Sequence, residues 1–135
     1  MKRHILIADD EDALLQLVSN FLQRRGYTVV TASSAEETLD AIREQPIDLA
    51  ILDLVWPDAD GMQLLETVRS IKPDLKIIII TGMGFRDDLV KESREKGAVG
   101  YISKAFTLDD LMQEVGRVLK ITKRGGKAEE EVAPA

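Results

Sequence analysis

The chain has 135 residues, of which 44% are hydrophobic and 31% charged, and its net charge at pH 7 is −6. This length suits one domain with a substantial core, and the absence of cysteine excludes disulfide bonds and thiolate zinc sites. The acidic balance without a long basic stripe argues against direct nucleic-acid binding. No apolar run approaches the roughly 20 residues that span a bilayer, and a strand-like run begins within four residues of Met1, so we expect no signal peptide, no membrane contact and a cytoplasmic location.

Strand-like runs alternate with helix-like segments five times along the chain. The predicted strands cover residues 4–8, 27–32, 49–52, 76–80 and 99–103. The continuous isoleucines of 76–80 predict a strand that is covered on both faces. The run at 27–32 is the most polar of the five, which predicts an edge strand.

The segments between these strands carry apolar residues at helical spacing. Helices are predicted at 12–24, 35–45, 61–71, 86–96 and 108–120. Ser34 precedes Glu37 by three residues, which predicts a capping box at the start of the second helix. From residue 122 to 135 the chain is charged and lacks periodicity, so we expect one domain over 1–121 followed by a disordered tail or linker over 122–135.

This alternation is typical of the α/β class, with a doubly wound parallel sheet of five strands and helices on both faces. The carboxyl ends of parallel strands lie along one edge of the sheet, where such folds bind ligands. Polar residues follow four of the predicted strands at that edge: Asp9 and Asp10, Asp53, Thr81, and Lys104. Carboxylates, a hydroxyl group and an ammonium group in one crevice suit a hard divalent cation beside a phosphoryl group.

The order and spacing of these motifs resemble the receiver domain of two-component response regulators, of the chemotaxis-regulator type. The resemblance covers about residues 3–121 and rests on four motifs: Asp9-Asp10-Glu11, residues 53–61, Thr81-Gly82, and residues 100–104 before Phe106. Each motif is weak alone, and their combination is specific. The resemblance, rather than the residues themselves, implies a flavodoxin-like (β/α)5 fold with strand order 2-1-3-4-5.

The resemblance also implies a role for each residue. Asp53 would accept a phosphoryl group from a sensor histidine kinase or a histidine phosphotransfer protein, while Thr81 and Lys104 would contact phosphoryl oxygens. Mg²⁺ would be held by the carboxylates and one backbone carbonyl of Asp9, Asp10, Asp53 and Val55. The domain would be a phosphorelay switch and not a turnover enzyme, with self-phosphorylation from small donors and slow autodephosphorylation as its own chemistry.

The residue types suit this chemistry, because a carboxylate that attacks a phosphoryl group is an anion approaching an anion. Positive charge from Mg²⁺ and from a lysine offsets that repulsion. The product, an aspartyl phosphate, is a covalent intermediate of an established kind.

Thr81 and Tyr101 resemble the switch pair of the family. Movement of Thr81 toward the phosphoryl group would draw the 82–86 loop with it and let Tyr101 turn inward. The fourth helix, fifth strand and fifth helix would then rearrange, which is where a downstream target, an effector domain or a second copy would bind. On the residues alone, Tyr101 is equally well explained as a half-exposed aromatic on an edge strand.

The chain departs from the family pattern at three positions. Ala105 follows the lysine where the family usually has a cis proline. A cis bond to a non-proline residue costs about 2.5–4 kcal/mol. Either the loop stores that strain, or the bond is trans and Lys104 is aimed differently; we expect a trans bond with some mobility. Val55 and Met83 flank the expected phosphoryl pocket and cannot position a water molecule, which predicts a long-lived phosphoryl state.

Two alternatives remain open on the residues. A pseudo-receiver would keep the fold and bind partners without taking phosphate. A phosphohydrolase of the haloacid dehalogenase type would also use an aspartate nucleophile, but in an Asp-x-Asp pattern after the first strand, whereas Asp9 and Asp10 are adjacent. Asp58 and Asp60 are predicted to be turn residues of the loop that ends at Gly61.

Overall fold

The main sheet carries the architecture of the domain. The structure is a computed structural model that describes residues 3–84 and 86–122. Five parallel strands follow the order β2-β1-β3-β6-β7, and their bounds are β1 His4–Ala8, β2 Thr28–Ala32, β3 Leu49–Asp53, β6 Lys76–Thr81 and β7 Gly100–Ser103. Because β4 and β5 form a separate small sheet, this is the expected order 2-1-3-4-5. The prediction of a doubly wound flavodoxin-like sheet is confirmed.

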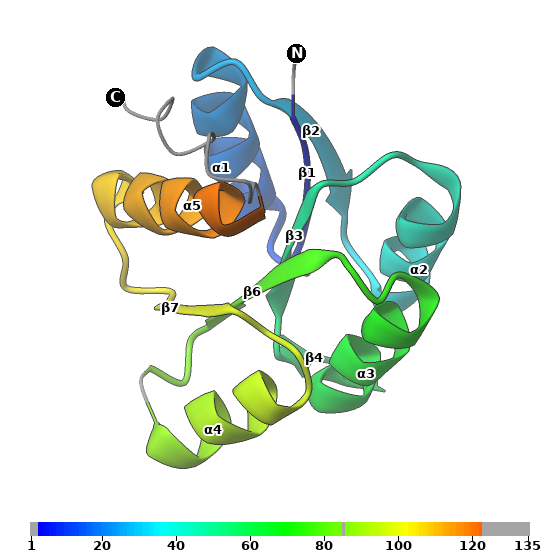
Figure 1. The fold of residues 1–135 in the computed structure, drawn as a ribbon. Helices are drawn as coiled ribbons and strands as arrows, with labels where there is room; N and C mark the ends of the chain where they lie inside the picture. Colours follow the sequence, from blue (N-terminus) through cyan, green and yellow to red (C-terminus); the bar gives the residue numbers. More distant parts are fainter. Residues whose placement is uncertain (1–2, 85, 123–135) are drawn as a thin grey trace.

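Helices cover both faces of this sheet (Figure 1). Helices α1 and α5 lie on one face, and α2, α3 and α4 lie on the other. Their bounds are α1 Asp12–Arg24, α2 Ala35–Glu44, α3 Gly61–Ile71, α4 Asp87–Glu95 and α5 Leu108–Thr122. Helix α5 therefore ends two residues later than predicted, while the rest of the expected tail, residues 123–135, lies outside the described residues. No described helix is long and apolar enough to cross a bilayer.

The two helical layers explain why the strands read as unbroken apolar runs. Alternate residues of a strand point to opposite faces. Ile51 and Ile78 pack toward α1 and α5, whereas Leu52 and Ile79 pack toward the other helices. All four side chains are at most 1% exposed, so both alternating positions must be apolar. Strand β2 lies at one edge of the sheet, as its polarity predicted.

The predicted capping box at α2 is confirmed in part. The Ser34 hydroxyl oxygen accepts a hydrogen bond from the Glu37 backbone N–H at 3.0 Å. The Glu37 carboxylate, however, accepts from the backbone and hydroxyl groups of Ser33 and not from Ser34. Backbone N–H groups on both sides of the helix start therefore still have side-chain acceptors, as in a capping box.

A short hairpin follows Asp53 and was not predicted. Strand β4, Val55–Trp56, pairs antiparallel with β5, Ala59–Asp60. Asp58 lies in the turn, as predicted, but the interpretation of Asp60 as a turn residue is wrong. Asp60 ends β5 and caps α3, since its carboxylate accepts hydrogen bonds from the backbone N–H groups of Met62, at 2.9 Å, and Gln63, at 3.3 Å.

Candidate functional site

The polar side chains converge at the carboxyl edge of the sheet, as the sequence predicted. Asp9 follows β1, Asp53 ends β3, Thr81 ends β6 and Lys104 follows β7. These strands are neighbours in the sheet, so their ends meet. Asp9, Asp53 and Thr81 are each at most 1% exposed, whereas Asp10 is exposed.

Lys104 joins the carboxylates of this cluster. Its ammonium nitrogen lies 3.0 Å from Asp9 Oδ2 and 3.0 Å from Asp53 Oδ2. A third carboxylate, that of Glu11, contacts the same nitrogen through Oε1 at 3.2 Å. The sequence signal for Glu11 was its place directly after Asp9 and Asp10, but its contact with Lys104 was not predicted.

The carboxylates are arranged to bind a cation. Asp9, Asp10 and Asp53 each present one oxygen, and these oxygens all lie within 4.8 Å of one another. Asp9 Oδ2 is buried and receives no hydrogen bond from the described residues; the Lys104 ammonium group compensates its charge as an ion-pair partner. A buried carboxylate oxygen that accepts no hydrogen bond from the described residues and lies beside two other carboxylates fits a hard divalent cation such as Mg²⁺ or Ca²⁺, which prefer oxygen ligands.

Backbone groups hold the two buried aspartates in place. Asp9 Oδ1 accepts from the Glu11 backbone N–H at 2.8 Å, and Asp53 Oδ1 accepts from the Val55 backbone N–H at 3.0 Å. The Trp56 indole N–H donates to the backbone carbonyl of Asp53 at 2.8 Å, a contact that sequence reasoning missed. Asp53 Oδ2 is thereby left to face Lys104.

Burial and charge oppose each other in this cluster. Burial raises the pKa of Asp9 to about 6, against the hydrogen bond from the Glu11 backbone and the contact with Lys104, and the Asp53 charge adds to the rise. Burial acts to lower the pKa of Lys104, but its hydrogen bonds to Asp9 and Asp53, together with their charges, outweigh burial and raise that pKa. Lys104 is therefore charged at neutral pH.

Thr81 and Tyr101 are linked through the loop after β6. The Thr81 hydroxyl oxygen accepts from the Met83 backbone N–H at 3.1 Å. The Tyr101 hydroxyl donates to the Gly84 carbonyl at 3.0 Å, and Gly84 adopts a φ of +73° that favours glycine. Tyr101 is 8% exposed, so its interpretation as a half-exposed edge aromatic is wrong, while its role as a switch stays a prediction.

The bond between Lys104 and Ala105 is trans, as predicted, and the described residues contain no cis peptide bond. The Ala105 backbone N–H donates to the Ser103 hydroxyl oxygen at 3.1 Å, and the Lys104 backbone N–H donates to the Thr81 carbonyl at 2.8 Å. The side chain of Lys104 nevertheless reaches Asp53. A trans bond after Lys104 is therefore compatible with contact between its ammonium group and Asp53, while a different aim of Lys104 stays a prediction.

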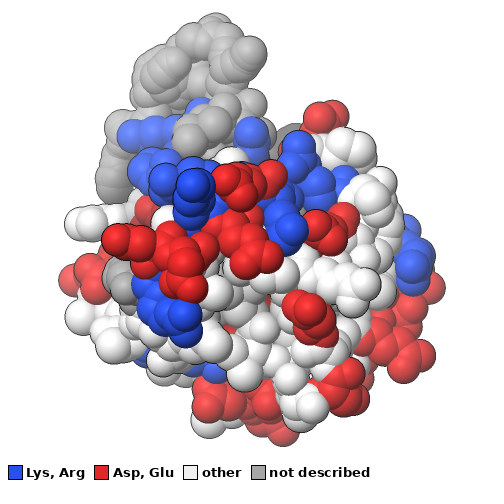
Figure 2. Space-filling view, turned by 90° about the horizontal axis from the view of Figure 1, so that it is seen from below, with Lys and Arg blue, Asp and Glu red and all other residues white. Residues whose placement is uncertain are grey.

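Charges of both signs are mixed over the face that Figure 2 shows. Acidic side chains gather near the centre of this view, with basic side chains beside them.

Comparison with known proteins identifies the family. The model of the response regulator receiver domain matches residues 5–116. The transcriptional regulatory protein GlrR of Escherichia coli (strain K12) is 34% identical over 117 residues, which cover 87% of this chain and 26% of GlrR. The chain thus spans about a quarter of that relative.

Two further matches cover almost the whole of the compared protein. Sporulation initiation phosphotransferase F of Bacillus subtilis (strain 168) is 30% identical over 121 residues, which cover 90% of this chain and 97% of that protein. The crystal structure of a CheY-like response regulator receiver domain protein from Methanospirillum hungatei JF-1 superposes with a TM-score of 0.84 at 31% identity, covering 98% of this chain and 100% of that one. Family match, fold and converging acidic edge agree, and the chain belongs to the receiver domains of two-component response regulators.

Proposed function

We propose that Asp53 of this chain, a member of a family of regulatory signalling domains, accepts a phosphoryl group from the phosphohistidine of a sensor histidine kinase or a histidine phosphotransfer protein. The observation that carries the proposal is the ammonium group of Lys104, 3.0 Å from Asp53 Oδ2 and from a second buried carboxylate. This ion pair places one fixed positive charge where a phosphoryl group attached to Asp53 would develop negative charge.

In the proposed transfer, Asp53 Oδ2 attacks the phosphorus atom, the phosphorus–nitrogen bond of the phosphohistidine breaks, and the imidazole leaves with the bonding electron pair. Lys104 then pairs with one phosphoryl oxygen and the Thr81 hydroxyl donates to another. A Mg²⁺ ion would supply the further positive charge that lets the two anions meet. Its proposed ligands are the carboxylates and one backbone carbonyl of Asp9, Asp10, Asp53 and Val55.

The signal would leave the site through the loop after β6. If the Thr81 hydroxyl turns toward a phosphoryl oxygen, its present hydrogen bond from the Met83 backbone N–H breaks. The freed loop includes Gly84, whose carbonyl is bound by the Tyr101 hydroxyl. A local charge at Asp53 thereby shifts a segment that is tied to an edge strand, which is the general form of a phosphorylation switch.

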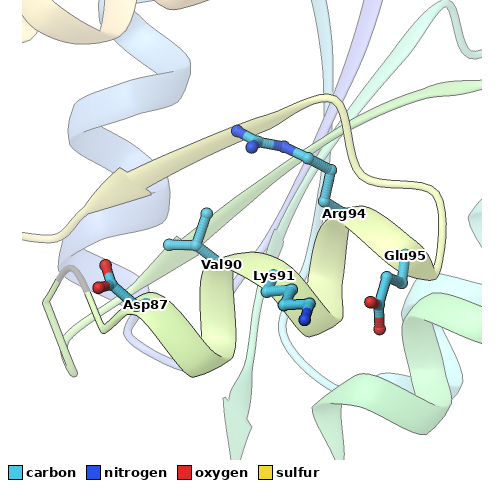
Figure 3. A pocket seen from close by; sticks show the side chains of 5 residues that line it. All are labelled: Asp87, Val90, Lys91, Arg94 and Glu95. Atoms are coloured by element: carbon cyan, nitrogen blue, oxygen red, sulfur yellow. The ribbon is translucent and has the colours of Figure 1, made fainter.

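The receiving surface would be α4, β7 and α5, the fourth helix, fifth sheet strand and fifth helix of the sequence prediction. A hollow of about 480 Å³ runs along α4, with Val90 bordered by charged residues of both signs (Figure 3). A second hollow of about 580 Å³ lies between β7 and α5, beside Tyr101 and Phe106. Apolar side chains within mixed charge suit a protein partner, such as a downstream target, an attached effector domain or a second copy.

We assign this activity to a receiver domain that extends to the end of α5 at residue 122, with the remainder of the sequence, which lies outside the described residues, as a tail or linker. The domain would act as a switch, with self-phosphorylation from small donors and slow autodephosphorylation. Membership of the receiver family removes the support for a phosphohydrolase of the haloacid dehalogenase type. A pseudo-receiver is the remaining alternative, and the intact cluster of Asp53 and Lys104 argues against it.

The test is incubation with Mg²⁺ and phosphoramidate, with phosphate release and intact mass followed together. We expect labelling that approaches one phosphoryl group per chain in wild type and none in Asp53→Asn. Asp58→Asn is the matched control, because Asp58 is an exposed carboxylate in the neighbouring turn and should label normally. Rapid multiple turnover would indicate a phosphohydrolase, and no labelling despite Mg²⁺ binding would indicate a pseudo-receiver.

A further inference from the structure

The Glu11 side chain does not cap the helix at whose start it lies, but contacts a distant lysine. Glu11 is the N-cap residue of α1, with φ −94° and ψ 107°, and its side chain makes no capping hydrogen bond. The side chains of Ser, Thr, Asp and Asn at this position ordinarily accept a hydrogen bond from the first turn of the helix. That of Glu11 instead contacts Lys104, 93 residues further along the chain.

The three carboxylates around the Lys104 ammonium group are not equivalent. Asp9 and Asp53 are buried and belong to the cation cluster. Glu11 lies outside that cluster, and its side chain is 60% exposed. An ammonium group has three protons to donate, and each of the three carboxylates lies within 3.2 Å of the nitrogen.

A divalent cation in the cluster would compete with Lys104 for the carboxylates of Asp9 and Asp53. The cation and the ammonium group also repel each other, so Lys104 must draw back from Asp9 and Asp53 when the cation binds. Glu11 is the carboxylate that remains as its partner, because the contact with Glu11 does not use a cluster oxygen. Lys104 can thus move away from the carboxylates of Asp9 and Asp53 and still stay beside the cation cluster.

We propose that Glu11 is a positioning residue, which holds the Lys104 ammonium group beside the cation cluster while a divalent cation occupies it and so raises the affinity for that cation. The proposal rests on the proposed function in one respect: the reason for holding Lys104 there is that it would pair with the phosphoryl group. The effect on cation binding exists with or without phosphorylation.

The test is a double-mutant cycle on Mg²⁺ affinity, measured through Trp56 fluorescence and the NMR shift of its indole N–H, because Trp56 donates to the Asp53 backbone. We expect Glu11→Gln to weaken Mg²⁺ binding by roughly twofold to fivefold, the range of a partly exposed ion pair. In the Lys104→Gln background the same substitution should have no effect, since the cycle isolates the pair. Asp12→Asn removes an equal charge from the first turn of α1 and controls for general electrostatics.

An unchanged Mg²⁺ affinity in Glu11→Gln would overturn the proposal, as would an equal loss with and without Lys104 or an equal loss in Asp12→Asn. These outcomes are separate from the proposed function, which fails only if Asp53 takes no label. Normal labelling of Asp53 combined with an additive cycle would leave the proposed function standing and remove the role of Glu11.

Discussion

Asp9→Asn should stabilise the metal-free domain, although it removes a residue of the candidate site. Burial raises the pKa of Asp9 from 3.8 to about 6, so the fold favours the protonated form. The stability from this group is fully present below about pH 4 and is lost as the pH rises through 6. At pH 7 the folded domain therefore carries an unfavourable carboxylate, and a shift of about two pH units corresponds to about 3 kcal/mol. Asparagine is a neutral replacement of the same shape.

The assay is urea or thermal denaturation in EDTA at pH 7 and at pH 4.5. At pH 7 we expect Asp9→Asn to unfold with a free energy up to about 3 kcal/mol above that of wild type, or roughly 10 °C higher in Tm for a domain of this size. The gain should shrink strongly at pH 4.5, where wild-type Asp9 is protonated. Added Mg²⁺ should stabilise wild type and not the variant.

Asp10→Asn is the matched control, because Asp10 belongs to the same cluster but is exposed. It should weaken Mg²⁺ binding without the gain in metal-free stability. The reasoning is refuted if Asp9→Asn is no more stable than wild type at pH 7, or if its advantage is equal at the two pH values.

Three further predictions concern the same site and its support. Mg²⁺ must displace the proton from Asp9, so its affinity should fall up to about tenfold per pH unit below pH 6 in a fluorescence titration, and a flat profile would contradict the raised pKa. Met83 is 47% exposed beside the site, and Met83→Asn should speed loss of the phosphoryl group several-fold in a mass-spectrometric time course; an unchanged or slower loss would argue against an apolar shield. A Cβ at Gly61 would overlap the Leu54 carbonyl oxygen, so Gly61→Ala should lower the free energy of unfolding by at least about 1–3 kcal/mol. Gly116→Ala in α5 meets no obstacle and should raise it by about 1 kcal/mol, and the opposite ranking in urea denaturation would show that the Gly61 contact is unimportant.

The sheet and the meeting of its polar ends could be predicted because both follow from a strong local signal. Runs such as Ile77–Ile80 are apolar at every position, which requires cover on both faces and hence a parallel sheet. Because β3 and β7 are parallel and only β6 lies between them, Asp53 and Lys104 lie at the same edge of the sheet, and the long side chain of Lys104 can span the intervening strand. The observed 3.0 Å contact is the detailed outcome of that topology.

Other features depend on loop geometry and side-chain reach, which have no periodic signal. The hairpin of β4 and β5 has two residues in each strand, too few for an alternating pattern to be recognised. The contact between Glu11 and Lys104 joins residues that are 93 positions apart on two loops. The burial of Tyr101 similarly depends on the path of the loop around Gly84.

The location of the phosphoryl group tests the central claim most directly. After treatment with phosphoramidate and Mg²⁺, tandem mass spectrometry of the digested protein should find an adduct of about 80 Da on the peptide that contains Asp53, as expected for one aspartyl phosphate. The adduct should be absent when EDTA replaces Mg²⁺. An adduct on a different residue, or an unlabelled Asp53 in protein that demonstrably binds Mg²⁺, would contradict the account.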